Sequence, residues 1–208
     1  MAKRVSASEK YFPLKMTRAN LDQLPEFALP PGFALRWYQP GDEAHWLRIH
    51  LAADQFNEIT AKLFRMQFAV GKTRGLHPDS AQEPRNGRKS APQELGDRQS
   101  YLVAPTGKVI GTGTAWFNDS FEDARWGRVH WMAILPEFQG RGLGKALLCV
   151  ICRRLRELRH ERAYLTTSAA RVPAIALYLK FGFEPMIRSA DDAVVWQSVL
   201  SRVKRQGR

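Results

Sequence analysis

The sequence has few cysteines and no long apolar run. Its two cysteines, Cys149 and Cys152, are too few for the disulfide scaffold of a small secreted protein. The longest wholly apolar stretch, residues 146–152, is far shorter than the ~20 residues that a membrane-spanning helix needs. The first ten residues are polar and charged and lack the apolar centre of a secretory signal. These features predict a cytoplasmic protein with no membrane partner.

Acidic residues are also scarce. There are 20 Asp and Glu against 32 Lys and Arg, a net charge of +12. Such a balance attracts anions, including nucleic acid and phosphorylated ligands. Many basic residues fall in the opening arm and at the end of the chain, where charge is commonly solvated. No ordered stripe of basic and aromatic residues is visible, so a nucleic-acid partner is an alternative that the charge alone supports weakly.

The composition is that of a folded domain. The chain has 208 residues, of which 44% are hydrophobic and 25% charged, and this length predicts one domain. We interpret residues 1–32 as a basic, Pro-containing arm or short strand, residues 33–200 as the domain, and residues 201–208 as a basic tail. Residues 71–93 hold three Gly and three Pro, which predicts a flexible insertion. An active-site lid is the alternative for that segment.

Hydrophobic periodicity predicts an alternation of strands and helices. Asp42 is the expected N-cap of the first helix, and residues 118–125 are expected to be a polar connection. The final strand is expected at residues 194–199. The predicted fold class is α+β or mixed α/β, with strands at residues 33–38, 100–104, 108–116, 128–135, 163–167 and 194–199, and helices at residues 43–53, 58–70, 142–159 and 173–181.

The most informative segment is a glycine-rich turn that follows a strand and opens a helix. It reads Gln139, Gly140, Arg141, Gly142, Leu143, Gly144, Lys145. Glycine permits positive φ and close approach of a ligand to the backbone, and a helix N-terminus favours phosphate. The third glycine of the dinucleotide fingerprint and the Gly-Lys-Ser/Thr of a phosphate-binding loop are both missing here. The turn predicts a pyrophosphate site of another kind.

This turn resembles the (Gln/Arg)-x-x-Gly-x-(Gly/Ala) signature of the GNAT superfamily of N-acetyltransferases. The strand before it, residues 129–136, is similar to the fourth strand of that family. Residues 174–183 resemble its Ala-x-x-Leu-Tyr-x-x-x-Gly-Phe helix, and the resemblance covers roughly residues 100–183. Arg171 stands where the family usually has Asn. The resemblance implies a GNAT-like mixed, mostly antiparallel sheet, split between its fourth and fifth strands, with helices on both faces.

The resemblance also implies a co-substrate, acetyl-CoA, and a reaction, transfer of its acetyl group to a primary amine by direct attack. The pantetheine arm would pair with the backbone of Met132, Ala133 and Ile134 like an added strand. The N–H groups of Ile134 and Leu135 would stabilise the oxyanion. The pyrophosphate would rest on the turn, and no metal is expected. The implied cofactor-binding residues are Met132, Ala133, Ile134, Leu135, Gln139, Gly140, Arg141, Gly142, Leu143, Gly144, Lys145, Arg171 and Ala174.

Two residues are the candidate catalytic groups. Tyr178 matches the family tyrosine that often protonates the leaving thiolate, and its alternative role is packing, with its hydroxyl hydrogen-bonded to the cofactor. His130 is a candidate general base because its pKa lies near working pH, although a hydrogen-bonded strand histidine is the more common case. Glu122 and Asp123 are weaker candidates in a loop. Arg128 occupies a place where some relatives carry a base Glu.

Other functions stay open at this point. The acceptor is a small molecule or a peptide, and the sequence leaves a homodimer open. The alternatives are a basic nucleic-acid-associated protein and a CoA-binding regulator that keeps the fold without turnover. The CxxC spacing of Cys149 and Cys152 lies inside a helix and not at its N-terminus, so we interpret it as packing and not as redox chemistry.

Overall fold

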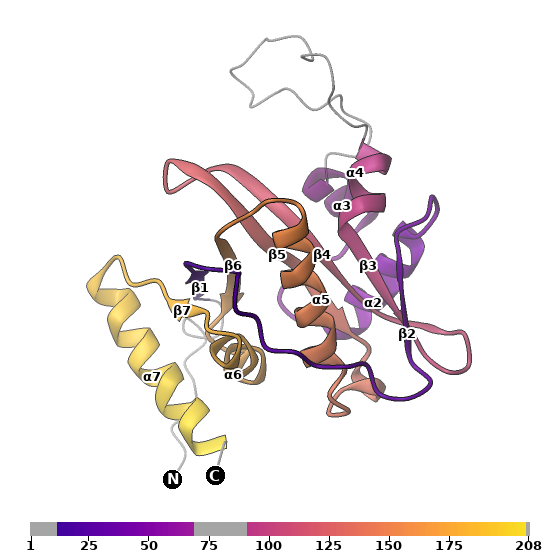
Figure 1. Cartoon of the computed structure of the whole chain (residues 1–208). Coiled ribbons are helices and arrows are strands. Elements are labelled where there is room, and N and C mark those ends of the chain that lie inside the picture. The colour runs from indigo at the N-terminus through magenta and orange to yellow at the C-terminus, as the bar shows by residue number, and fades with distance from the viewer. Residues whose placement is uncertain (1–11, 69–90, 207–208) are drawn as a thin grey trace. The chain divides into compact units, whose positions relative to one another are not determined.

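A computed structural model describes residues 12–68 and 91–206 (Figure 1). The predicted flexible insertion at residues 71–93 lies mostly outside the described residues, but its end is wrong, because a helix already begins at Ala91. The elements, in chain order, are β1 (Pro13–Arg18), β2 (Ala34–Trp37), α2 (Glu43–Ala53), α3 (Ala61–Phe68), α4 (Ala91–Arg98), β3 (Gln99–Val103), β4 (Val109–Phe121), β5 (Ala124–Ile134), the 3-10 turn η1 (Pro136–Phe138), α5 (Leu143–Glu157), β6 (Ala163–Ser168), α6 (Val172–Lys180), β7 (Glu184–Pro185) and α7 (Ala190–Gln206).

The chain divides into two compact units. Unit 1 comprises Met1–Phe27, Ala115–His130 and Cys152–Arg208, and unit 2 comprises Ala28–Thr114 and Trp131–Ile151. Strands β4 and β5 and helix α5 each contribute residues to both units. Contacts are therefore described within one unit at a time.

The strands follow the order β2-β3-β4-β5-β6-β1-β7. The pairs β2–β3, β3–β4, β1–β6 and β1–β7 are antiparallel. Strands β5 and β6 are parallel and pair at Gly127↔Ala163 and Arg128↔Tyr164, near the start of both strands. The expected mixed, mostly antiparallel sheet is confirmed.

Residues before position 33 supply a strand to this sheet. In β1, Leu14 and Met16 are buried, while Pro13 and Lys15 are exposed, which is the period-two pattern of a half-buried strand. The strand lies between β6 and β7. Of the two structures considered for this arm, the short strand is the one that forms.

The predicted polar connection at residues 118–125 is wrong, because β4 and β5 continue through it as a long hairpin. Its turn is only Glu122 and Asp123, both at positive φ of 50° and 57°, the combination that a type I′ turn requires. Aromatic side chains hold the strand ends together. Phe121 stacks on Tyr164 at 3.8 Å between ring centroids and meets Trp126 edge-on at 5.4 Å. Burial of these rings outweighs the polar composition of the turn.

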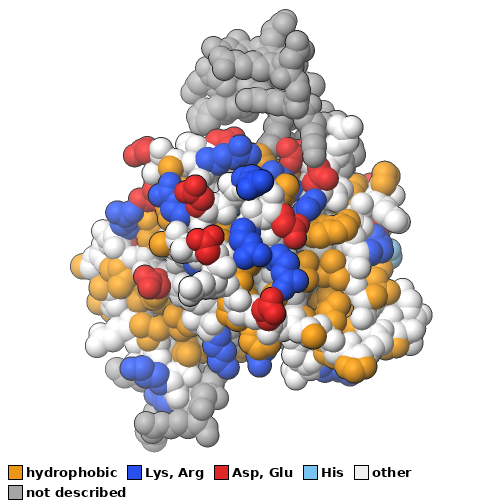
Figure 2. Space-filling view, viewed as in Figure 1, with side chains coloured by type: hydrophobic (Ala, Val, Ile, Leu, Met, Phe, Trp, Pro, Cys, Tyr) orange, Lys and Arg blue, Asp and Glu red, His pale blue; other side chains and the backbone are white. Residues whose placement is uncertain are grey.

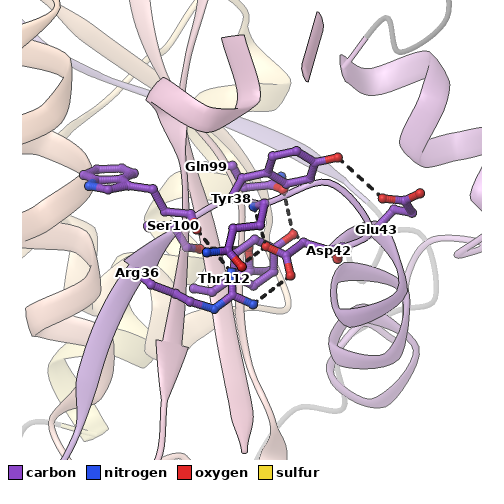
Figure 3. A network of polar contacts seen from close by, with 10 residues as sticks. Arg36, Tyr38, Asp42, Glu43, Gln99, Ser100 and Thr112 are labelled. Atoms are coloured by element: carbon purple, nitrogen blue, oxygen red, sulfur yellow. Dashed lines mark hydrogen bonds and ion pairs between the residues drawn. The ribbon is translucent and has the colours of Figure 1, made fainter. Parts of the chain in front are cut away.

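The first helix begins where the sequence predicts, with Asp42 at the N-cap position, but the Asp42 side chain does not cap it. Its carboxylate makes no capping bond; it accepts two hydrogen bonds from Arg36, at 2.6 and 2.7 Å, and one from the Gln39 N–H at 2.7 Å (Figure 3). Burial opposes ionisation of this carboxyl, but the bonds from Arg36 and Gln39 outweigh it and lower the pKa of Asp42. Asp42 thus ties the strand–helix corner to β2.

Helix α3 begins three residues later than predicted, its predicted end at residue 70 lies outside the described residues, and it presents a different face to the core. It begins at Ala61, and the residues it buries are Phe64 and Phe68. Met66, expected on the apolar face, is 66% exposed. Both phenylalanines pack against Trp46 of α2, at centroid distances of 5.2 and 6.1 Å. The larger aromatic surface of the phenylalanines decides which face turns inward.

The predicted strand at residues 194–199 is wrong: helix α7 covers it. Val195, Trp196 and Val199 are buried, and their spacing fits one helical face as well as part of a strand. A capping box starts the helix. The Asp192 N–H donates to Ser189 Oγ at 3.1 Å, and the Ser189 N–H donates back to Asp192 Oδ2 at 3.0 Å. The Ser-x-x-Asp signal for this cap is present in the sequence.

Replacing the cap residue should destabilise α7 measurably. We expect Ser189→Ala to lower the free energy of unfolding by about 0.5–2 kcal/mol, because the Asp192 N–H loses its acceptor. Urea unfolding measures this change. The matched control is Ser201→Ala, since Ser201 lies on the same helix and donates only to the Gln197 carbonyl at 2.9 Å. Equal losses from both variants would contradict the capping role.

Candidate active site

The glycine-rich turn keeps its backbone open in unit 2. Gly140 and Gly142 have φ of +76° and +81°, and a Cβ built on either meets no atom within 4 Å. Helix α5 begins immediately afterwards, at Leu143. The N–H groups of Leu143 and Gly144 open the helix and have no partner inside it, whereas the Lys145 N–H donates to the Gly142 carbonyl at 3.0 Å. The helix dipole adds positive charge there. The turn therefore offers an uncovered cradle for a phosphate group.

Side chains of the same turn fix its position. The Gln139 side-chain amide donates to the Ile134 carbonyl at 2.9 Å, which links the turn to the end of β5. Arg141 donates to the Glu137 carbonyl at 3.1 Å, and its guanidinium lies 5.1 Å from the centre of the Phe138 ring. Arg141 and Lys145 are exposed, whereas the Leu143 side chain is buried. Leu143 can therefore contribute only backbone to a ligand.

The end of β5 offers a backbone edge beside this turn. The Leu135 N–H, predicted to stabilise the oxyanion, donates to the Ile110 carbonyl of β4 at 2.8 Å. The Ala133 carbonyl lies 3.2 Å from where a Cβ of Gly111 in β4 would stand. Because successive residues of a strand turn their N–H and C=O groups to opposite edges, Ala133, which is predicted to pair with pantetheine, turns its carbonyl towards β4. The same alternation turns Met132 and Ile134 to the other edge.

A backbone irregularity precedes this edge. Trp131 has φ +46°, a left-handed conformation that is strained for a bulky side chain. Tertiary contacts within unit 2 hold it. The indole N–H donates to Gln67 Oε1 at 3.1 Å, and the ring lies edge-on to Trp46 and His50 at 5.0 and 5.1 Å. Sequence reasoning missed Trp131 and Gln67, because no local signal marks left-handed backbone at a tryptophan.

Tyr178 lies on α6 in unit 1, and the end of the helix fixes it. The Phe183 N–H donates to the Tyr178 carbonyl and the Gly182 N–H donates to the Leu179 carbonyl, both at 3.0 Å, which is a Schellman motif with Gly182 at φ +70°. Gly182 ends the helix as the sequence predicts. Burial raises the pKa of the Tyr178 phenol, an effect that Arg171 opposes. Within the described part of the chain, its hydroxyl makes no hydrogen bond.

The other predicted residues of unit 1 vary in exposure. His130 is buried in β5, at 4% exposure. Arg171 precedes α6 and Ala174 lies on it, and both are half-buried. Glu122 is exposed in the hairpin turn and forms an ion pair with Arg188. The structure thus describes Met132–Leu135 and Gln139–Lys145 together in unit 2, and His130, Arg171, Ala174 and Tyr178 in unit 1.

Neither Cys149 nor Cys152 forms a disulfide with a described residue, and both are buried in α5, which fits packing. Over residues 12–68 and 91–206, no group of three or more His, Cys, Asp or Glu side chains could hold a metal ion. In the same ranges, no helix is both long and apolar enough to cross a membrane.

Figure 2 shows Lys and Arg side chains interspersed with Asp and Glu on the face in view, with no continuous basic band.

The chain belongs to the acetyltransferase (GNAT) family, whose model matches residues 53–183. Mycothiol acetyltransferase of Pseudarthrobacter chlorophenolicus is 30% identical over 174 residues, which cover 82% of this chain and 48% of that protein. The chain therefore spans about half the length of the curated relatives that it matches.

Solved structures are similar in fold. A GCN5-related N-acetyltransferase from Sphaerobacter thermophilus has a TM-score of 0.60 at 17% identity, covering 84% of this chain and 48% of that one. The ribosomal-protein-S18-alanine N-acetyltransferase from Escherichia coli has a TM-score of 0.52 at 19% identity, covering 74% of this chain and 79% of that one. At these identities, the likeness concerns the fold alone.

Proposed function

We propose that this chain transfers an acetyl group from acetyl-CoA to a primary amine by direct attack. The observation that carries the proposal is the open turn from Gln139 to Lys145, with left-handed Gly140 and Gly142 directly before the N-terminus of α5. Family membership supports the same activity. When bound, acetyl-CoA supplies an acetyl group activated as a thioester.

The turn would hold the pyrophosphate through backbone N–H groups and through the charges of Arg141 and Lys145. Both side chains are exposed at the rim of the turn, and charge-assisted hydrogen bonds to phosphate are among the strong ones. Gln139 would keep the turn in register with β5 through its bond to the Ile134 carbonyl. Arg171 and Ala174 are proposed as further contacts of the co-substrate.

The backbone edge of Met132 and Ile134 would bind the pantetheine amides. The Ile134 N–H is the better candidate for the charge that develops on the acetyl oxygen, because the Leu135 N–H already donates to β4. The strained Trp131 directs this edge away from β4, since a left-handed residue breaks the regular alternation of a strand. Of the two N–H groups that the sequence suggests for the oxyanion, those of Ile134 and Leu135, this assignment keeps the one of Ile134.

Tyr178 is proposed to protonate the leaving thiolate. A phenol whose pKa is raised stays protonated at neutral pH, and its hydroxyl is not committed to another described residue. His130 remains the proposed base, acting on the attacking ammonium through water because its side chain is buried. The acceptor is proposed to be a small molecule or a peptide.

Release of free thiol from acetyl-CoA tests the activity. We expect release that depends on both the protein and a primary amine, measured over a panel of small amines and peptides with free N-termini. Acetylated product identified by mass spectrometry would confirm the acceptor. Binding of CoA without thiol release from any member of the panel would contradict the transferase and favour a CoA-binding regulator.

A further inference from the structure

One positively charged side chain of unit 1, Arg128, has no role in the proposed acetyl transfer. Arg128 lies in β5 and is half-buried. It pairs in register with Tyr164 of β6, and Tyr164 pairs with Thr17 of β1. Residues that pair in register place their side chains on the same face of a sheet, so Arg128, Tyr164 and Thr17 form one row across three strands.

The Arg128 guanidinium has no negative partner within the described residues. No carboxylate forms an ion pair with it, and its Nε is buried without a hydrogen-bond acceptor. Its ring neighbour is Tyr164, whose centroid lies 5.5 Å from Cζ. Burial lowers the pKa of Arg128, and the Tyr164 phenol acts in the opposite direction. An arginine nevertheless keeps its charge at neutral pH.

Two other arginines that contact this hairpin, by contrast, have carboxylate partners. Arg125, three residues earlier in β5, forms an ion pair with Asp119 at 3.3 Å, and Arg188 forms one with Glu122. These pairs lie at exposed positions, where an ion pair contributes little. Arg128 is the more buried cation and would gain most from a counter-charge, because a desolvated charge without a partner is costly.

The surroundings of Arg128 suit an anion. The Asn118 side-chain amide donates to the Tyr164 hydroxyl at 3.3 Å, which leaves the hydroxyl proton available for an oxyanion. In the next row of the sheet, Lys15 pairs with Thr166, and both are exposed. Lys15 Nζ lies 5.7 Å from the centre of the Phe121 ring, which stacks on Tyr164. The forked donor of Arg128 and the Tyr164 hydroxyl supply the chemistry that carboxylate and phosphate groups require.

We propose that Arg128 is the centre of an anion-binding site on this face of unit 1, which takes a carboxylate or phosphate group of a ligand. The identification of that ligand as the amine acceptor rests on the proposed acetyl transfer; the site itself does not. If both hold, the acceptor is an amine that also carries a negative charge, and Arg128 is a specificity-determining residue.

Thermal unfolding in inorganic phosphate tests the site. Phosphate is titrated in the presence of saturating CoA, which would occupy the phosphate cradle of residues 139–145, and at constant ionic strength against NaCl, because salt screens surface charge in both arms. We expect phosphate to raise the melting temperature of the parent by mass action. In Arg128→Met, the apparent affinity for phosphate should fall roughly tenfold or more, the effect of losing a charged hydrogen bond. In NaCl alone, Arg128→Met should melt at the same temperature as the parent or higher.

Two further variants separate the site from general charge and from folding defects. Arg125→Met removes an equal charge from the same strand and should keep the parental response to phosphate. Arg128→Lys keeps the charge but loses the fork, so it should fold normally and bind phosphate more weakly than the parent. The proposal is overturned if the parent shows no phosphate-specific stabilisation, or if Arg128→Met retains it.

Amines distinguish the source of the anion in the same melting assay, without acetyl-CoA. Ethanolamine is compared with phosphoethanolamine, and β-alaninamide with β-alanine. Stabilisation by the charged members at lower concentrations than by phosphate assigns the anion to an acceptor, whereas equal potency with phosphate assigns it to a free anion. Thiol release with the same panel tests acetyl transfer separately, so failure of either proposal is visible by itself.

Discussion

Gly142→Val should abolish binding of CoA. In the parent, CoA at about a hundred times its dissociation constant should stabilise the fold by about 2.7 kcal/mol. For a chain of this size, that corresponds to a rise in melting temperature of roughly 5–11 °C. Valine at this position would fill the open cradle and disfavour the φ of +81° on which the turn depends. The variant should show no shift, as measured by thermal unfolding with and without CoA.

The matched control for this variant is Gly107→Val. Gly107 has φ +82° and, like Gly142, open space around its Cβ position, but it belongs to the turn between β3 and β4. The backbone strain is therefore the same in both variants, while only one lies in the predicted phosphate cradle. Gly107→Val should keep the CoA shift. A parental shift in Gly142→Val would place the CoA site elsewhere.

Tyr178→Phe should reduce turnover by about 10²–10⁴-fold, the usual range for general acid catalysis. The ring contact with Phe183, at 6.2 Å between centroids, survives the change, so the fold and the affinity for CoA should stay near parental values. Because burial raises the pKa of this phenol, its hydroxyl keeps the proton up to a higher pH than an ordinary tyrosine does. Loss of this proton should therefore not lower the turnover of the parent at any pH below 10.

Steady-state kinetics with the best amine from the thiol-release panel gives the comparison. Tyr38→Phe is the control, because it also removes one phenolic hydroxyl, which lies 3.5 Å from Glu43 Oε2 in unit 2, and it should keep parental turnover. If Tyr178→Phe keeps turnover near the parental value, Tyr178 only packs and does not act as the acid. A loss of CoA affinity without a loss of turnover would instead assign its hydroxyl to co-substrate binding.

Local signals in the sequence were sufficient for much of the fold. The stripe of apolar residues predicts α5, and Gly182 predicts the end of α6 by a mechanism that the Schellman bonds confirm. The sequence failed where tertiary contacts decide. Residues 118–125 are polar, yet they form strand because Phe121 and Trp126 pack with Tyr164. Residues 194–199 fit both periods, and the Ser189–Asp192 capping box selects the helix.

The same division holds for the candidate site. The turn from Gln139 to Lys145 could be found from its glycines, because their spacing is itself the backbone requirement. The orientation of the β5 edge could not, since it depends on the left-handed Trp131 and on its partners, which include Gln67, 64 residues away in the chain. Nor could the sequence show that Arg128 has no counter-charge among the described residues, because its neighbours come from three strands.

Hydrogen exchange of the full chain with and without CoA tests the central claim most directly. The account predicts slowed exchange at the backbone amides of residues 139–145 and at the β5 edge of Met132 and Ile134. The amides of Leu135 in β5 and of α7 should exchange as before, because the former already donates to Ile110 and the latter lies outside the proposed site. Protection confined to other segments, with residues 139–145 unchanged at saturating CoA, would contradict the assignment of the co-substrate site.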